Sequence, residues 1–496
     1  DADGTLNEDD YDDDGNGLID IANVSDFNLI RENLRGSNLP QMPGCLNSRP
    51  IGKLCYGYEL VADIDFSDHG NWEPLGGCEI REQGTNLPLC ISSNMFSSLL
   101  EGNNHTLSNI SIHQNSGENT FGIGLFGAIA SSAEIRNMHL VGVSITKGSD
   151  SFPWYVGALA GVADGGTISS VSVSGDSVIG SFFVGGLVGF SYKGTRIDNT
   201  HAKFTKVESA FQNAGGLVGY ISECTITSSS AKSNEVSSLF SPGGRAGGLV
   251  GTLDRCNVRQ SYAINGIVNS KDQHAGGLIG RSDDSNISSS YATSDLVVTR
   301  VTLVGGFIGA AVGSKISTSF SQTHSVTGSS RRSGFVGAAS SRSTIESSYA
   351  FTGSRTDGNA TEFVFNIDGG DTVLKNSYAV SKNKDTLWAG GSSINVDSSY
   401  WDLDVSGATT DANARATSVL QGTTDFTGDY MNWGMGWCDP LTGEFTTDQT
   451  HAQAAGYVNN IAWDLGGAND YPVISCFNSI TPAQQRQLHT DFLNNY

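Results

Sequence analysis

The sequence predicts an all-β protein that folds as a right-handed parallel β-helix of roughly ten three-stranded coils. Three observations predict this class. A short glycine-rich phrase returns about every 29 residues, an aliphatic column follows each phrase, and the connecting segments hold Ser, Asn, Asp and Gly in place of helix formers. The chain has 62 Gly and only 10 Pro among 496 residues, and it lacks the Leu/Ala/Glu/Lys-rich runs of a helical solenoid.

The repeated phrase has the form GLxG or a close variant. Its closing glycines are Gly127, Gly161, Gly189, Gly219, Gly251, Gly280, Gly309 and Gly337. In stacked coils each residue lies over its counterpart at a strand spacing of about 4.8 Å. A bulky side chain at an inward corner would collide with its copy in the next coil, so we expect glycine at the tightest corners.

An aliphatic column follows the phrase about ten residues later. Its members are Ile135, Ile168, Ile197, Ile226, Val258, Ile287, Ile316, Ile345, Leu374 and Val396. A looser apolar patch comes next, as in LVVT at residues 296–299. These three segments, separated by polar corners, predict three short strands in each coil.

The phrase GGLVG followed by xIxxSYA resembles the GLUG repeat of secreted bacterial proteins, among them some immunoglobulin-A proteases and large surface proteins. The resemblance covers roughly residues 121–404. It implies a β-helix in a secreted or surface-exposed bacterial protein. It does not extend to a protease site, because the sequence contains no HExxH motif.

Four regions follow from this organisation. Residues 1–24 form an Asp-rich segment, 25–120 a capping helix and the disulfide-containing start of the β-helix, 121–405 the repeats, and 406–496 a disulfide-containing C-terminal cap with a short terminal helix. The caps are needed because an open β-helix has two unpaired edges that invite self-association.

Each cap has its own helix signal. At the front, Ser25 can cap a helix that buries Phe27, Ile30 and Leu34 and stops at Gly36. The C-terminal cap is predicted from Trp433, Trp437 and Trp463 together with the cysteine pair Cys438 and Cys476. In its last segment Thr481 can cap a helix that opens with Pro482.

Charge and cysteine usage bound the environment. The net charge of −23 disfavours nucleic acid and anionic lipid as partners, and no apolar stretch is long enough to insert into a membrane. The chain starts at Asp1 without Met, so we expect a mature or trimmed protein. Its cysteines are Cys45, Cys55, Cys78, Cys90, Cys224, Cys256, Cys438 and Cys476. This even number predicts disulfides in a secreted or cell-surface protein, although connectivity stays open.

The Asp-rich segment predicts a calcium site. The candidate ligands are Asp10, Asp12, Asp14, Asn16 and Asp20. Alternating carboxylates before a glycine present oxygens on one side of a turn, which suits Ca²⁺. No Glu stands at the twelfth position, where Ile21 or Asn23 lies, so Asp20 would substitute. A solvated acidic tail is the alternative.

An aromatic column is the second candidate surface. It consists of Tyr262, Tyr291, Phe320, Tyr349, Tyr378 and Tyr400. If Ser261 and Ala263 face inward, Tyr262 faces out, and a flat exterior row of rings could stack on sugars. Alternatively, the rings only stabilise neighbouring coils and cover a corner.

Catalysis is not favoured by the sequence, and no catalytic residue is assigned. A polysaccharide hydrolase or lyase on this fold needs clustered carboxylates, and the best pair is Asp402 and Asp404 in YWDLDVSG. The sequence therefore favours an extracellular structural or adhesive protein, able to self-associate through its ends or to bind a surface glycan. The alternatives are a polysaccharide-degrading β-helix enzyme and a carbohydrate-binding module that uses the tyrosines.

Overall fold

The computed structural model describes most of the repeat region and parts of both flanks. The described residues are 12, 16–36, 56–78, 94–115, 121–148, 151–152, 154–240, 243–355, 360–366, 372–381, 386–390, 394–402, 414–416, 420–421, 437–439, 445–446, 449–454, 462–465 and 470–494. They form two compact units. Unit 1 comprises Asp1–Ala210 and Gly216–Thr225, and unit 2 comprises Phe211–Gly215 and Ile226–Tyr496.

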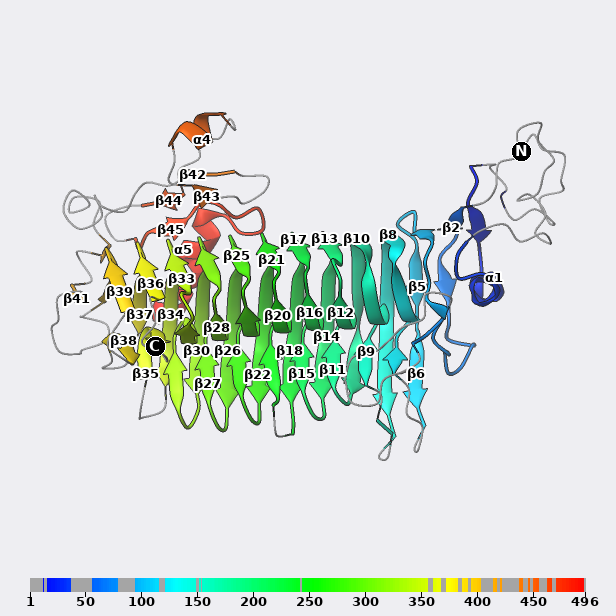
Figure 1. The fold of residues 1–496 in the computed structure, drawn as a ribbon, viewed down its shortest axis with the longest axis horizontal. Helices are drawn as coiled ribbons and strands as arrows, with labels where there is room; N and C mark the ends of the chain where they lie inside the picture. Colours follow the sequence, from blue (N-terminus) through cyan, green and yellow to red (C-terminus); the bar gives the residue numbers. More distant parts are fainter. Residues whose placement is uncertain are drawn as a thin grey trace. The chain divides into compact units, whose positions relative to one another are not determined.

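The fold is a parallel β-solenoid of about nine turns, as the sequence predicts. Figure 1 shows its strands running side by side in successive coils. Among the described residues, helices are few, and none is long and apolar enough to span a bilayer.

Unit 1 contains two short helical turns and the first coils. Its helical elements are α1 (Val24–Leu29) and the 3₁₀ turn η1 (Ile30–Glu32). Its strands are β1 (Ile19–Ile21), β2 (Gly57–Leu60), β3 (Ile64–Asp65), β4 (Leu99–Glu101), β5 (Thr106–Ser108), β6 (Ser111–Gln114), β7 (Gly122–Ile123), β8 (Phe126–Lys147), β9 (Tyr155–Gly157), β10 (Ala160–Gly180), β11 (Phe183–Gly185), β12 (Val188–Tyr192), β13 (Arg196–Asp198), β14 (His201–Ser209) and β16 (Val218–Ser222).

Unit 2 contains the later coils and the C-terminal elements, and β17 (Thr225–Thr227) lies at the boundary of the two units. Its first strands are β15 (Asn213–Gly215), β18 (Ser230–Ser238), β19 (Arg245–Gly247), β20 (Val250–Asp254), β21 (Asn257–Arg259), β22 (Tyr262–Ser270), β23 (His274–Gly276), β24 (Ile279–Asp283), β25 (Asn286–Ser288), β26 (Tyr291–Thr299), β27 (Leu303–Gly305), β28 (Ile308–Val312), β29 (Lys315–Ser317) and β30 (Phe320–Thr327). The coils continue with β31 (Arg331–Ser333), β32 (Val336–Ser340), β33 (Thr344–Glu346), β34 (Tyr349–Arg355), β35 (Ala360–Asn366), β36 (Thr372–Lys375), β37 (Tyr378–Ser381), β38 (Thr386–Gly390), β39 (Ile394–Asp397), β40 (Tyr400–Asp402) and β41 (Ala414–Arg415). The remaining elements are β42 (Trp437–Cys438), β43 (Phe445–Thr446), α4 (Gln449–Ala454), β44 (Trp463–Asp464), β45 (Val473–Ile474) and α5 (Pro482–Asn494).

One full coil of unit 2 holds four strands where three were expected. The coil made of β23, β24, β25 and β26 pairs in parallel with the next coil, and each residue lies opposite the residue 29 positions later. The fourth strand arises because the glycine phrase separates β23 from β24 instead of lying inside one strand. The parallel winding and the period are those that the sequence predicts.

A left-handed residue forms one corner of each of these coils. The residue after the aliphatic strand has φ between +45° and +52° in seven coils of unit 2. These residues are Ser228, Gln260, Ser289, Thr318, Ser347, Asn376 and Ser398. A single residue in this left-handed region turns the chain sharply. The polar residues at these corners therefore have a conformational role, since they turn the chain, in addition to being hydrophilic.

A column of buried serines completes the same corner. The backbone N–H of Ser290 donates to Oγ of Ser319 in the next coil at 3.3 Å, and that hydroxyl donates to the Ser317 carbonyl at 2.8 Å. The pattern repeats through Ser229, Ser261, Ser290, Ser319, Ser348, Ser377 and Ser399. Each hydroxyl satisfies a buried N–H that the bent backbone leaves without a strand partner.

The glycine phrase serves close backbone approach. A Cβ at Gly277 would overlap the carbonyl oxygen of Gly306 in the next coil, and one at Gly276 would overlap the carbonyl oxygen of Ile279. The sequence analysis expected glycine here because a side chain would collide with the equivalent side chain of the next coil. In the structure, a side chain would instead collide with backbone carbonyl oxygens. Glycine is needed at both positions because no side chain fits there.

The N-terminal helix is shorter than expected and has a different cap. The cap of α1 is Asn23, whose Oδ1 accepts the backbone N–H groups of Ser25 and Asp26 at 2.9 and 3.1 Å. Ser25 thus lies inside the helix, which is a correction to the sequence prediction. The amide of Asn23 reaches these donors because its backbone is extended.

The C-terminal helix agrees with the sequence. α5 starts at Pro482, and Oγ1 of Thr481 accepts the Gln484 backbone N–H at 3.3 Å. Proline needs no hydrogen-bond acceptor at this first position. The disulfide between Cys438 and Cys476 is present and fixes the segment that leads into α5.

Candidate functional surfaces

The aromatic residues form one column in unit 2. Consecutive ring centroids from Tyr262 to Tyr291, Phe320 and Tyr349 are 4.8, 4.9 and 4.8 Å apart, with the planes within 4° of each other. Tyr378 continues the stack at 5.3 Å. The rings adopt this spacing because they stand on residues that pair in register in adjacent coils.

This column is not an open surface. Tyr291, Phe320, Tyr349, Tyr378 and Tyr400 are all buried, and Tyr262 alone is half-buried. The cover is the segment 470–494, which we name the strap. Its Phe477 places its ring edge-on against Tyr291 and Phe320 at 5.6 and 5.3 Å. The rings thus lack the exposure that stacking on a sugar requires.

Polar side chains of the coils hold the strap in place. Nε2 of Gln260 donates to the Cys476 carbonyl at 2.7 Å, and Nε2 of Gln322 donates to the Leu488 carbonyl at 3.1 Å. The Tyr349 hydroxyl donates to Oε1 of Gln485 at 2.8 Å, and Oε1 of Gln260 accepts the Asn478 backbone N–H at 2.9 Å. Figure 1 shows α5, in red, beside the green and yellow strands to which these contacts belong.

The expected calcium ligands lie partly outside the described residues. Asp10 and Asp14 are not described. Oδ2 of Asp12 accepts the Gly17 backbone N–H at 3.0 Å, and Asp20 lies in β1 opposite Glu59. No three carboxylate, imidazole or thiolate groups converge on a metal position within the described part of the chain.

Glu59 belongs to this acidic region, although the sequence analysis missed it. Its Oε1 accepts Nδ2 of Asn16 at 2.6 Å, and its strand lies between that of Asp20 and that of Glu101. Burial opposes ionisation of Glu101, yet hydrogen bonds from the Asn103 backbone and from Arg136 outweigh it, so its pKa lies below the ordinary value. The alternation in YELVADIDF could have placed Glu59 on the strand face that also carries Asp20 and Glu101 in the neighbouring strands.

Of the carboxylate pair considered for catalysis, the structure describes Asp402, which does not line an open cleft. Asp402 is 1% exposed, and its Oδ2 accepts the Tyr471 hydroxyl at 2.7 Å. Asp404 lies outside the described residues. In the described structure, Asp402 helps to anchor the strap.

Unit 1 carries an aromatic patch that the sequence analysis missed. Half-buried rings form it over buried Tyr155 and Phe190, and they lie in, or directly before, the strands on both sides of the glycine phrase. The half-buried members are Phe121, Trp154, Phe182, Phe183, Tyr192 and Tyr220. Its signal is visible in FFVGGLVGFSY and GLVGYIS, where aromatic residues flank successive phrases.

The patch combines stacked rings with one ion pair. Trp154 and Phe182 stack at 4.3 Å, and Phe190 and Tyr220 at 5.1 Å. Nζ of Lys193 lies 3.0 Å from Asp164 and 4.6 Å from the centroid of the Tyr192 ring. A surface of partly exposed rings beside charged hydrogen-bonding groups has the composition that suits a sugar face.

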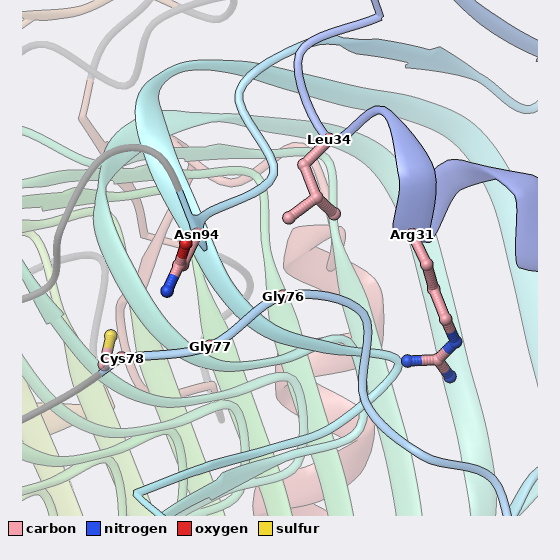
Figure 2. A pocket seen from close by; sticks show the side chains of 6 residues that line it. All are labelled: Arg31, Leu34, Gly76, Gly77, Cys78 and Asn94. Carbon is pink, nitrogen blue, oxygen red and sulfur yellow. The ribbon is translucent and has the colours of Figure 1, made fainter.

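A hollow also opens near the N-terminal helix. Figure 2 shows the residues that line it, which are Arg31, Leu34, Gly76, Gly77, Cys78 and Asn94. The volume of this hollow is about 370 Å³. The Arg31 guanidinium donates to the Pro74 carbonyl at 2.9 Å and lies 5.0 Å from the Trp72 ring. Arg31 therefore joins η1 to the segment 72–74.

Disulfides occur in both units. Besides the bond from Cys438 to Cys476, the residues Cys78, Cys224 and Cys256 are disulfide-bonded, and no cysteine is free in the part of the chain that the structure describes. The Cys256 backbone N–H donates to Oγ of Ser285, so this cysteine occupies a position that is serine in later coils.

The fold and these surfaces define a disulfide-containing β-solenoid protein. No protein-family model matches the chain, so the resemblance to the GLUG repeat remains an expectation. One segment is 36% identical over 134 residues, 27% of this chain, to halomucin of Haloquadratum walsbyi. Another match is 33% identical over 123 residues, 24% of this chain, to a "Putative Gly-rich membrane protein" of Evansella cellulosilytica. The matched segments span only 1% and 12% of those proteins.

Among solved structures, the chain is similar to a "putative immunoglobulin A1 protease" from Bacteroides ovatus. The similarity has a TM-score of 0.33 and 16% identity, and it covers 86% of this chain and 91% of that one.

Proposed function

We propose that the protein is an extracellular structural or adhesive β-solenoid. The observation that carries the proposal is the coil itself, in which serine columns, left-handed corners and glycine contacts repeat with a 29-residue register. Repeats that bond chiefly to their neighbours add up to a stiff scaffold with long exposed faces. Such faces suit a protein that spans or contacts other material.

Disulfides and charge support the extracellular part of the proposal. Structural disulfides persist in oxidising compartments, and five described cysteines are bonded. A net charge of −23 keeps a protein soluble in salt solution. The partial similarity to halomucin and to a membrane-associated glycine-rich protein agrees with a surface location.

The location is tested by the redox state of the cysteines in the producing cells. Intact cells are quenched in acid, their proteins are alkylated without reductant, and the intact mass is compared with that of a reduced sample. We expect no alkylation before reduction and eight adducts after it, together with removal of the protein by protease added to intact cells. A protease-resistant protein with alkylated cysteines would contradict the proposal.

The aromatic patch is the surface to which we assign adhesive contact, and a neutral glycan is the partner that its chemistry favours. Ring faces stack on the apolar faces of sugars, while Lys193 and Asp164 supply a donor and acceptors at the edge. A neutral polysaccharide is favoured over an acidic one because the acidic protein repels polyanions.

Affinity electrophoresis through neutral and acidic polysaccharides tests this assignment. A neutral glycan should retard the wild-type protein. The double variant Trp154→Ala with Tyr220→Ala should bind this glycan with an affinity at least ten-fold lower. Exposed Tyr56→Ala, outside the patch, serves as the control and should bind normally. Equal retardation of both variants would exclude the patch.

A further inference from the structure

The strap carries a histidine in an environment that does not suit its charge. His489 lies on α5, is 4% exposed, and stacks on Phe351 of β34 at a centroid distance of 4.0 Å. The rings of Tyr349 and Tyr471 stand edge-on to it at 5.2 and 6.4 Å. Within the described residues neither ring nitrogen has a hydrogen-bond partner. Buried polar groups without partners are uncommon, so this imidazole makes docking of α5 weaker than it could be.

The charged groups around His489 do not stabilise an imidazolium. Arg486 lies one turn earlier on α5 and pairs with Asp464 at 2.6 Å and with Asp470 at 3.5 Å. On β40, the carboxylate of Asp402 is engaged by the Tyr471 hydroxyl. On the neighbouring coil, His324 pairs with Asp295 at 3.0 Å and stacks on Phe492. Arg486, the positive charge nearest to His489 along the chain, disfavours a second positive charge on the His489 imidazole.

Protonation therefore acts on docking in one direction. Burial, reinforced by Arg486, lowers the pKa of His489 to about 3, whereas a released imidazole titrates near its ordinary 6.5. Because the docked pKa is the lower one, docking is fully favoured above pH 6.5 and weakens as the pH falls toward 3. Between pH 7.5 and pH 5 this difference reduces the docking equilibrium constant about thirty-fold.

We propose that the α5 part of the strap is released by low pH: protonation of His489 undocks Pro482–Asn494 and uncovers the rings of Tyr349 and Phe351 beneath it. The disulfide from Cys438 to Cys476 lies just before α5, so the released helix stays tethered and returns when the pH rises. The coils beneath keep their own hydrogen bonds and do not need α5 for their register. This inference is independent of the extracellular function and of the glycan partner.

Peptide-resolved hydrogen exchange on the full, oxidised chain tests the strap. Exchange is measured at pH 7.5 and pH 5.0 and corrected for the intrinsic rate at each pH. We expect the opening equilibrium of peptides that cover α5 to rise about thirty-fold in the wild type, while peptides of β25 and β29 stay protected. Peptide resolution separates this effect from buried His274, whose pKa burial also lowers to about 3 but which lies on β23.

Two variants assign the effect to one histidine. His489→Phe keeps the stacked ring and cannot titrate, so its α5 opening should change less than three-fold with pH and should be lower than wild type at pH 7.5. His324→Gln removes the other imidazole beside α5 and should keep the thirty-fold response. If the larger ring prevents docking at pH 7.5, His489→Met serves as the non-titrating variant. A wild-type α5 that opens equally at both pH values, or a response that survives in the non-titrating variant, overturns the proposal.

Discussion

At the scale of single residues, the fold depends on contacts between residues 29 positions apart. The sequence predicted small and polar corners, and these corners are present. It did not predict that a serine hydroxyl receives an N–H from the preceding coil, because that bond exists only after two coils stack. For the same reason it predicted glycine correctly but assigned the close contact to side chains, whereas the contact is with carbonyl oxygens.

Ser319→Ala tests the serine column. The substitution leaves the buried N–H of Ser290 without its acceptor, which costs about 1–3 kcal/mol, and the Ser317 carbonyl keeps only its bond from the Ser289 backbone N–H. The midpoint of urea unfolding should fall accordingly. The matched control is Ser288→Ala in the neighbouring strand, where the side chain is only half-buried and the midpoint should stay within error. An equal loss in both variants would remove the special role of the column.

At the scale of elements, the position of the aromatic column could be predicted and its exposure could not. Strand alternation correctly placed Tyr262 and its counterparts on one file. The cover comes from the strap, which begins 70 residues beyond Tyr400, and no local pattern connects the two. The start of α5 was predicted because Thr481 and Pro482 form a local signal, while the cap of α1 was misplaced by two residues because both Asn23 and Ser25 are suitable caps.

The Asp-rich segment remains a calcium prediction at this scale. We expect millimolar Ca²⁺ to protect the peptides around β1 and β2 from hydrogen exchange, and a chelator to reverse this, because bound cation would offset repulsion between the carboxylates. Asp12→Ala with Asp14→Ala should abolish the effect. Asp68→Ala, an exposed carboxylate outside the segment, should preserve it. Protection that is identical with and without Ca²⁺ would remove the prediction.

At the scale of the whole molecule, the period of the sequence carried most of the information. Repetition near 29 residues predicted a parallel solenoid, and the structure confirms that fold with four strands in a coil where three were expected. Function was less predictable, since side chains brought together by stacking, such as the aromatic patch of unit 1 and the environment of His489, are far apart or unremarkable in the sequence. Within the described residues, the scaffold carries a half-buried aromatic patch in unit 1 and a covered aromatic column in unit 2.

The most direct test of this account is cysteine cross-linking at the predicted register. Asn286 lies opposite Lys315 in the next coil, and Lys315 lies opposite Thr344 in the coil after that. Neighbouring strands are about 4.8 Å apart, within disulfide range, whereas two coils are roughly 9.6 Å apart. Asn286→Cys with Lys315→Cys should therefore form a disulfide on mild oxidation, and Asn286→Cys with Thr344→Cys should not. Bonding in the second pair but not in the first would contradict a solenoid with a 29-residue turn.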